Sequence, residues 1–167
     1  MYDQRFRKII NEENEMMLFF ILLQAVLLIF MLFHDWIPIP PLNDVGTLKK
    51  VDGNFYRLLG SLINGATVLI PLLITLYYRQ SSMPLSASVT IFAFYFFLTI
   101  GTILSWWVPY FFGSSQKHQG QFSKFKNTHH FLPARGSNVI PNTLHVILHL
   151  QVWLCLMISI YFLMNHY

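Results

Sequence analysis

Charged residues are scarce in this chain. Asp, Glu, Lys and Arg make up 11% of its 167 residues, whereas hydrophobic residues make up 54% and the mean hydropathy is +0.49. Soluble domains carry about 25% charged residues, and so few could not cover a surface that faces water. The composition therefore excludes an ordinary soluble domain and predicts a multi-pass integral membrane protein, with the lipid bilayer as its main partner.

Basic residues form no continuous stripe. The net charge is +4, but the 11 Lys and Arg residues are dispersed over several short segments. Nucleic-acid binding needs basic residues clustered on one face or along one helix, so nucleic acid is excluded as a partner. Dispersed basic residues are instead typical of positions that set membrane topology or contact lipid headgroups.

Cysteine is nearly absent, and several catalytic motifs are missing. Cys155 is the only cysteine, which excludes a disulfide within the chain and the paired cysteines of vitamin K epoxide reductase-like proteins. No HExxH or GxSxG motif occurs. The seven histidines are too few and too scattered for the histidine boxes of membrane di-iron hydroxylases. The apolar runs carry no charges at their centres, which disfavours a channel or transporter.

The sequence does contain four apolar runs that are long enough to cross a bilayer. They predict an all-α fold: an integral membrane four-helix transmembrane bundle that forms a single domain over residues 1–167. Four spans place the two long loops, residues 38–54 and 113–140, on the same membrane face. The expected spans are residues 16–33, 58–78, 86–112 and 142–164.

Local features add detail to these spans. Residues 1–15 mix acidic and basic side chains and predict a short interfacial helix ahead of a retained anchor rather than a cleaved signal. Pro71 predicts a kink in the second span. The small residues from Gly60 to Gly65 predict close helix packing. Pro141 suits the first position of the last helix.

The distribution of basic residues also bears on orientation. Seven lie in or beside the long loops and four lie on the opposite side, which favours a cytoplasmic location for the long loops under the positive-inside rule. The first set is Lys49, Lys50, Arg57, Lys117, Lys124, Lys126 and Arg135, and the second is Arg5, Arg7, Lys8 and Arg79.

Histidines gather on the long-loop face. Six of the seven are assigned to it by the span count alone, and only His166 falls on the opposite face. His145 and His149 lie four residues apart at the start of the last span, so both rings project from one side of the helix. This spacing suits two ligands of one metal ion. It equally suits general acid–base catalysis, because the ordinary pKa of histidine lies near neutrality.

The candidate site is built around that helical pair. His145, His149 and Arg135 are the candidate catalytic residues, with Arg135 placed to orient an anionic headgroup. His145 and His149 are also the candidate ligands for a divalent metal, although the sequence leaves the cofactor unknown and keeps haem open as well. The candidate substrate-binding residues are His129, His130, Asn138, Asn142, Trp106, Trp107 and Tyr110.

Each candidate has a purely structural alternative. A neutral histidine near the headgroups can serve packing alone, and Arg135 can contact lipid phosphate. The asparagines can cap the last helix or satisfy a turn, and the tryptophans can form an interfacial belt. Three further polar residues are expected to form interhelical hydrogen bonds: Gln24, Asn64 and Gln151.

Three functions remain open at this stage. The first is a membrane-embedded enzyme that acts on a lipid or lipid-linked substrate at the headgroup level. The second is a non-catalytic accessory, immunity or assembly subunit of a membrane complex, which would require a membrane protein partner. The third is a metal or haem carrier that uses the histidine face.

Overall fold

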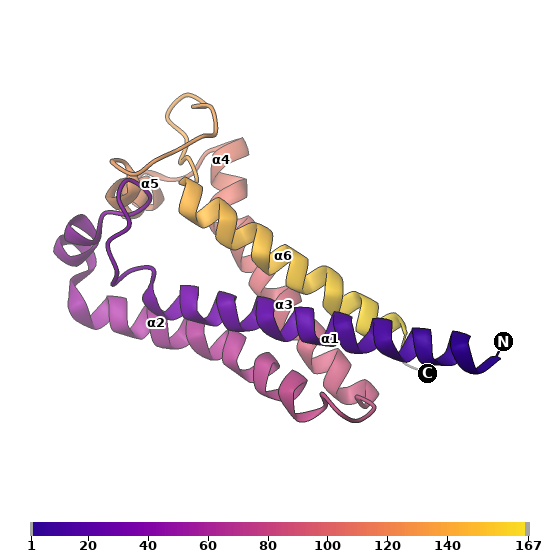
Figure 1. The fold of residues 1–167 in the computed structure, drawn as a ribbon. Helices are drawn as coiled ribbons and strands as arrows, with labels where there is room; N and C mark the ends of the chain where they lie inside the picture. Colours follow the sequence, from indigo (N-terminus) through magenta and orange to yellow (C-terminus); the bar gives the residue numbers. More distant parts are fainter. Residues whose placement is uncertain (1, 166–167) are drawn as a thin grey trace.

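The computed structural model describes residues 2–165, and it describes the side chains of residues 13–165. Every regular element in this range is a helix, so the predicted all-α fold is confirmed (Figure 1). The elements are α1 (Tyr2–Phe33), α2 (Val45–Tyr77), α3 (Leu85–Thr102), the π-helix η1 (Ile103–Trp107), α4 (Val108–Phe112), α5 (Gln116–Phe122), the 3₁₀-helix η2 (Ser123–Phe125) and α6 (Thr143–Met164).

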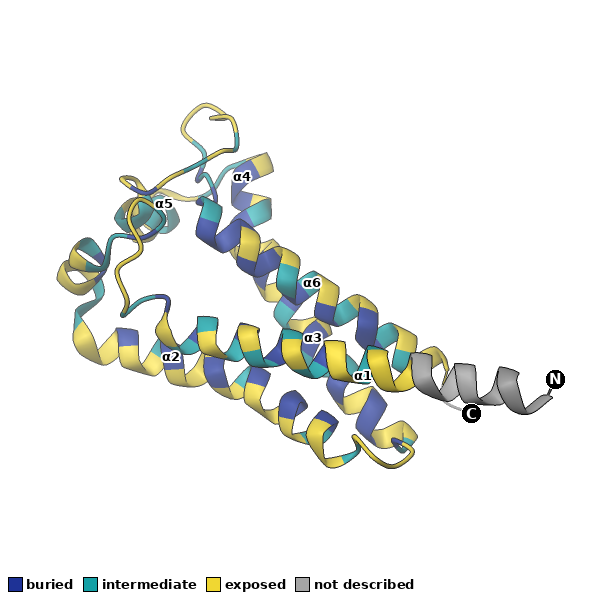
Figure 2. Ribbon diagram, in the orientation of Figure 1, coloured by how far each residue is buried: buried dark blue, intermediate teal, exposed yellow. Residues whose placement is uncertain are grey.

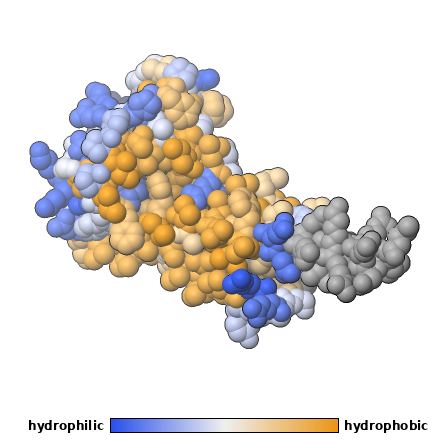
Figure 3. Space-filling model, viewed as in Figure 1, coloured by the Kyte–Doolittle hydropathy of each residue, from blue (hydrophilic) through white to orange (hydrophobic). Residues whose placement is uncertain are grey.

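Four helical stretches are long and apolar enough to cross a membrane. Their bounds are Glu13–Phe33, Val45–Tyr77, Leu85–Phe112 and Thr143–Met164. Large apolar side chains point outward along them: Leu62, Phe97 and Met157 are 56%, 68% and 62% exposed. Figure 2 shows exposed residues along the outer helix faces, and Figure 3 shows a hydrophobic middle between polar ends. This is the surface that a bilayer solvates.

The two long loops lie at one end of the bundle, as predicted, and the short connection between α2 and α3 lies at the other (Figure 1). Both loops contain more helix than expected. In the first, α2 already begins at Val45, because the Asp44 carboxylate caps it by accepting the backbone N–H of Thr47 at 2.9 Å. The second loop contains α5 and η2.

Three further details of the helices differ from the predictions. The non-helical dihedral angles of α2 fall at Gly53, with a φ of +69° that favours glycine, and not at Pro71. The last helix takes Asn142 as its cap and begins at Thr143, so Pro141 precedes the cap. Residues 2–15 form no separate interfacial helix, because α1 runs unbroken from Tyr2 to Phe33.

The helices associate mainly as two pairs, α1 with α2 and α3 with α6, and α1 also packs on α6. Phe20, Ile91, Tyr95 and Val152 form the centre of the core and are at most 1% exposed. Toward the loop end the two pairs diverge, which is plain in Figure 1. That divergence makes room for a cavity among the helices.

Two of the three predicted interhelical hydrogen bonds are present. The Gln24 side chain on α1 donates to Thr75 Oγ1 on α2 at 3.1 Å. The Gln151 side chain on α6 donates to the Leu23 carbonyl oxygen at 3.0 Å. Asn64 instead turns toward the cavity at the loop end.

Candidate functional site

A cavity of about 310 Å³ opens where the two helix pairs diverge. Its volume lies at the lower end of the range for small-molecule sites. Three histidines from opposite ends of the sequence meet there and are the only ionisable residues that line it. The lining residues are Met31, His34, Asn64, Leu98, Gly101, Thr102, Ser105, Trp106, His145, Leu148 and His149.

His145 is oriented by the cap of its own helix. The Oδ1 atom of Asn142 accepts two hydrogen bonds from His145, one from its backbone N–H at 3.0 Å and one from ring Nδ1 at 2.6 Å. An amide oxygen only accepts, so Nδ1 carries the proton. In the neutral ring, Nε2 is therefore free to accept a proton. The Trp106 ring packs against the imidazole with centroids 4.1 Å apart.

His149 is held in the opposite tautomer. The indole N–H of Trp107 donates to its Nδ1 at 3.2 Å, and an indole nitrogen is a donor only. Nδ1 is therefore unprotonated, and the neutral ring carries its proton on Nε2. The rings of His145 and His149 lie 6.2 Å apart between centroids. Both rings line one cavity. In their neutral forms, the His145 ring has an Nε2 that can accept a proton, and the His149 ring has an Nε2–H that can donate a hydrogen bond.

Both tryptophans come from the π-helix that interrupts the third span. The wide turn is marked by the backbone N–H of Val108 donating to the carbonyl of Ile103, five residues earlier. Pro109 has no N–H for the carbonyl of Ser105, and His118 Nε2 bonds to that carbonyl oxygen at 3.1 Å instead. π-helical turns frequently occur at functional sites, and this one directs Trp106 and Trp107 toward the two histidines.

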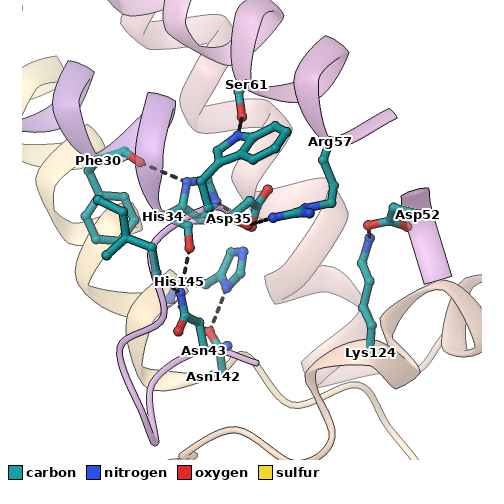
Figure 4. A network of polar contacts seen from close by, with 12 residues as sticks. Phe30, His34, Asp35, Asn43, Asp52, Arg57, Ser61, Lys124, Asn142 and His145 are labelled. Atoms are coloured by element: carbon teal, nitrogen blue, oxygen red, sulfur yellow. Dashed lines mark hydrogen bonds and ion pairs between the residues drawn. The ribbon is translucent and has the colours of Figure 1, made fainter. Parts of the chain in front are cut away.

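His34 closes the cavity from the end of α1. Its Nδ1 lies 2.9 Å from the Phe30 carbonyl oxygen, and its Nε2 lies 3.3 Å from Asp35 Oδ1. Both neighbours are acceptors, so His34 faces hydrogen-bond acceptors on either side of its ring. Its ring centroid is 5.9 Å from that of His145 (Figure 4).

The buried side chain of Arg57 stabilises the end of α1 next to His34. Arg57 is 4% exposed, although the sequence grouped it with the loop cations. It donates to the backbone oxygen of Asp35 and stacks on Trp36, with 4.3 Å from its guanidinium carbon to the ring centroid. The Trp36 indole N–H donates to Ser61 Oγ on α2 at 2.9 Å (Figure 4). These contacts tie the end of α1 to α2 and fix the position of His34.

The two long loops are joined above the cavity. The backbone N–H of His129 donates to the Pro41 carbonyl at 2.8 Å, and the His129 carbonyl accepts from Thr143 at 2.9 Å. The Asn142 amide donates to Thr128 Oγ1 at 3.0 Å. His129 Nδ1 contacts Thr143 Oγ1 at 2.7 Å. His129 thus holds the loops together and does not line the cavity.

Four other candidate residues also lie outside the histidine cavity. His130 faces the carbonyls of Pro141 and Phe125. Arg135 is exposed and stacks over Tyr110 and Phe111, with guanidinium-to-ring distances of 5.4 and 4.9 Å. The Asn138 amide donates to the Tyr110 carbonyl at 2.9 Å, and the Tyr110 hydroxyl donates to the Pro133 carbonyl at 3.1 Å. His130 and Asn138 line a separate loop cavity of about 500 Å³.

Of the ten candidates, the cavity therefore brings together His145, His149 and Trp106 directly, with Asn142 and Trp107 immediately behind the two rings. Sequence reasoning assigned His34 to the correct face but did not select it. It also predicted an interhelical hydrogen bond for Asn64, which instead lines the cavity. A polar ring at the end of an apolar run was the available signal for His34. His166 lies outside the described residues.

The donor set does not fit a metal ion well. Within the part of the chain that the structure describes, no group of three or more His, Cys, Asp or Glu is arranged to hold one. Nδ1 of His149 already accepts the Trp107 N–H, and Nε2 carries the proton, so neither ring nitrogen offers a lone pair to a metal. Nε2 of His34 is directed to Asp35. Only His145 retains a free ring nitrogen.

Comparison of the chain with protein-family models, with curated proteins and with solved structures finds no match. The geometry of the site is therefore what bears on function. Its central feature is a partly enclosed cavity with two imidazoles in opposite tautomers.

Proposed function

We propose that the protein is a membrane-embedded enzyme that cleaves or transfers an ester bond of a lipid by general acid–base catalysis. The observation that carries the proposal is the pair of opposite tautomers in one cavity, with His145 Nε2 free to accept a proton and His149 Nε2 able to donate a hydrogen bond. The cavity extends from the loop end of the spans, the end that we expect at the level of the lipid headgroups, down to Leu98.

The roles of the two rings follow from their tautomers. His145 takes a proton from an attacking hydroxyl, either water or an alcohol, and returns it to the oxygen that leaves the ester. His149 remains neutral and donates its Nε2–H to the oxygen on which negative charge develops. One proton is borrowed and returned, so the site is unchanged after each turnover.

Surrounding residues make this arrangement persistent. Asn142 keeps the proton of His145 on Nδ1, and Trp107 keeps that of His149 on Nε2. These two are positioning residues, because each acts through a histidine. The apolar wall formed by Trp106 and Leu148 lowers access of bulk water, which strengthens polar interactions inside the cavity.

The test uses purified protein in nanodiscs with a panel of ester lipids, with products followed by mass spectrometry. His145→Ala should lower turnover by about 10²–10⁴-fold and His149→Ala by about 10²–10³-fold. Leu150→Ala, on the lipid-facing side of the same helix, is the control and should retain turnover. Trp107→Phe keeps an aromatic ring, although a smaller one, and removes the N–H, so it should lower kcat more than it changes KM.

Other outcomes would overturn the proposal. Absence of turnover together with a stoichiometric membrane protein partner, retained through mild detergent extraction, would favour an accessory or assembly subunit. Stoichiometric metal by elemental mass spectrometry, or a haem absorption band, lost in the His145→Ala and His149→Ala double variant would favour a carrier. Equal losses of thermal stability in both single variants, without turnover in the unmodified protein, would assign the rings to packing.

A further inference from the structure

A second cavity lies on the membrane-facing side of the bundle. It is a groove of about 550 Å³ between α2 and α3, lined by Thr67 of α2 and by seven residues of α3 from Val89 to Gly101. Twelve residue steps along a helix correspond to about 18 Å, which is more than half of a typical hydrocarbon thickness. Val89 and Phe97 on its rim are 45% and 68% exposed, so the groove opens toward lipid.

The side chains that line the groove offer no free hydrogen-bond donor to an occupant. Its only polar side chains are Thr67 and Thr90. Their hydroxyls donate to carbonyls of their own helices, to Asn64 and to Ser86, each at 2.7 Å. What remains is a hydrocarbon lining, which suits an apolar chain and not a polar ligand.

The groove and the histidine cavity are neighbours. Leu98 and Gly101 line both of them. A Cβ atom added at Gly101 would meet no atom within 4 Å, so the space beside this residue is open. The apolar groove thus ends next to the cavity that His145 and His149 line.

We infer that the α2–α3 groove holds the hydrocarbon chain of the lipid whose headgroup enters the histidine cavity. The lipid enters sideways from the bilayer, and Gly101 is the position where chain and headgroup meet. The inference rests on the proposed function for the identity of the headgroup site. The groove adds the class of substrate, a lipid with a long unbranched chain, and the route by which it arrives.

The test uses a phosphatidylcholine that carries a photoreactive diazirine near the end of one acyl chain. The full-length protein is placed in nanodiscs with this lipid, irradiated, and its lipid adducts are mapped by mass spectrometry. Adducts on Val89 and Phe94, toward the far end of the groove from Gly101, should exceed those on Met157, which is a lipid-facing residue on α6. Gly101→Leu should reduce the groove adducts to the Met157 level.

Two matched variants control for folding. Gly60→Leu also adds a side chain where no atom lies within 4 Å, but outside the groove, and it should leave the adducts unchanged. Ala93→Leu fills the groove away from Gly101 and should reduce them as Gly101→Leu does. Thermal stability is measured for every variant, and only folded variants are compared.

The outcomes separate the groove from the chemistry. Groove adducts no stronger than those on Met157, or unaffected by both filling variants, would overturn the inference. Groove adducts that persist in His149→Ala while turnover is lost would support both proposals. Groove adducts that respond to filling in a protein without turnover on any ester lipid would uphold the groove and overturn the proposed enzyme.

Discussion

Helix α2 meets α1 across a closed interface and α3 across an open groove, although both contacts contain a glycine. On the α1 side, a Cβ atom at Gly65 would come within 2.6 Å of Leu32. On the α3 side, a Cβ atom at Gly101 would meet nothing. The closed side also has the Gln24–Thr75 hydrogen bond, whereas the hydroxyls of the open side turn back to their own helices.

The difference shows what binds helices together in lipid. Burying apolar surface between helices gains little there, because lipid tails solvate it equally well. Helices therefore close where small residues and hydrogen bonds match, and elsewhere lipid can fill the space. Three substitution experiments measure stability by thermal unfolding of the purified protein in detergent. Two address the closed interface between α1 and α2, and the third addresses the cap of α2.

The largest effect is expected from adding a side chain at Gly65, where the interface with α1 leaves no room for one. Gly65→Leu forces a side chain into the atoms of Leu32 and should destabilise the fold by about 3 kcal/mol or more, at the upper end of the range for overpacking. Gly60→Leu enters open space on the same helix and should leave the melting temperature nearly unchanged. The double variant Gly65→Leu, Leu32→Ala should recover part of the loss. Equal melting temperatures for the two leucine variants would contradict the closed interface.

A smaller and asymmetric effect is expected from the Gln24–Thr75 bond. Thr75→Val leaves the buried Gln24 amide without its acceptor and should destabilise by about 1–3 kcal/mol, the usual range for an unpaired buried polar group. Gln24→Leu removes the whole amide, including an oxygen that already has no partner. Its loss should be closer to the average of about 0.6 kcal/mol for membrane interhelical bonds. A larger loss for Gln24→Leu would refute this account.

The smallest effect is expected at Asp44, which caps the N-terminus of α2 ahead of the non-helical residue Gly53. Asp44 lies outside both the α1–α2 interface and the α2–α3 groove. Hydrogen bonds from the Thr47 side chain and backbone hold the pKa of Asp44 below its ordinary value of 3.8. The stabilisation is therefore present above the ordinary pKa and is lost as the pH falls through the lowered one. The melting temperature of Asp44→Asn should lie slightly below that of the unmodified protein at about pH 6, and the difference should shrink as the pH falls below 3.8 and through the lowered pKa of Asp44. A constant difference across this range would contradict the assignment.

The sequence was sufficient for the overall architecture because the signals were long and additive. Each span is about twenty residues long and predominantly apolar, and the span count alone places both long loops and most histidines at one end. The i, i+4 spacing of His145 and His149 likewise predicted that the two rings share a helix face, and the structure places both in one cavity.

The details of the site depended on contacts that no local pattern contains. Gly65 and Gly101 are the same residue type in similar apolar surroundings. Only the neighbouring helix decides that Leu32 occupies the space beside Gly65, whereas the space beside Gly101 stays open. The tautomers of the histidines depend on Asn142 and on Trp107, and the latter lies 42 residues away from His149. Arg135 looked catalytic because of its charge, but it stacks on aromatic rings away from the histidines.

The π-helix at Ile103–Trp107 is equivalent to one residue inserted into an α-helix. Removing one residue from it would restore ordinary α-helical geometry and rotate the preceding and following parts of the span relative to each other by about 100°. If Trp107 turned away with the following part, it would no longer reach His149, while the length and hydropathy of the span would hardly change. Under the proposed function, a deletion of one residue at this point would therefore abolish turnover without altering the membrane topology.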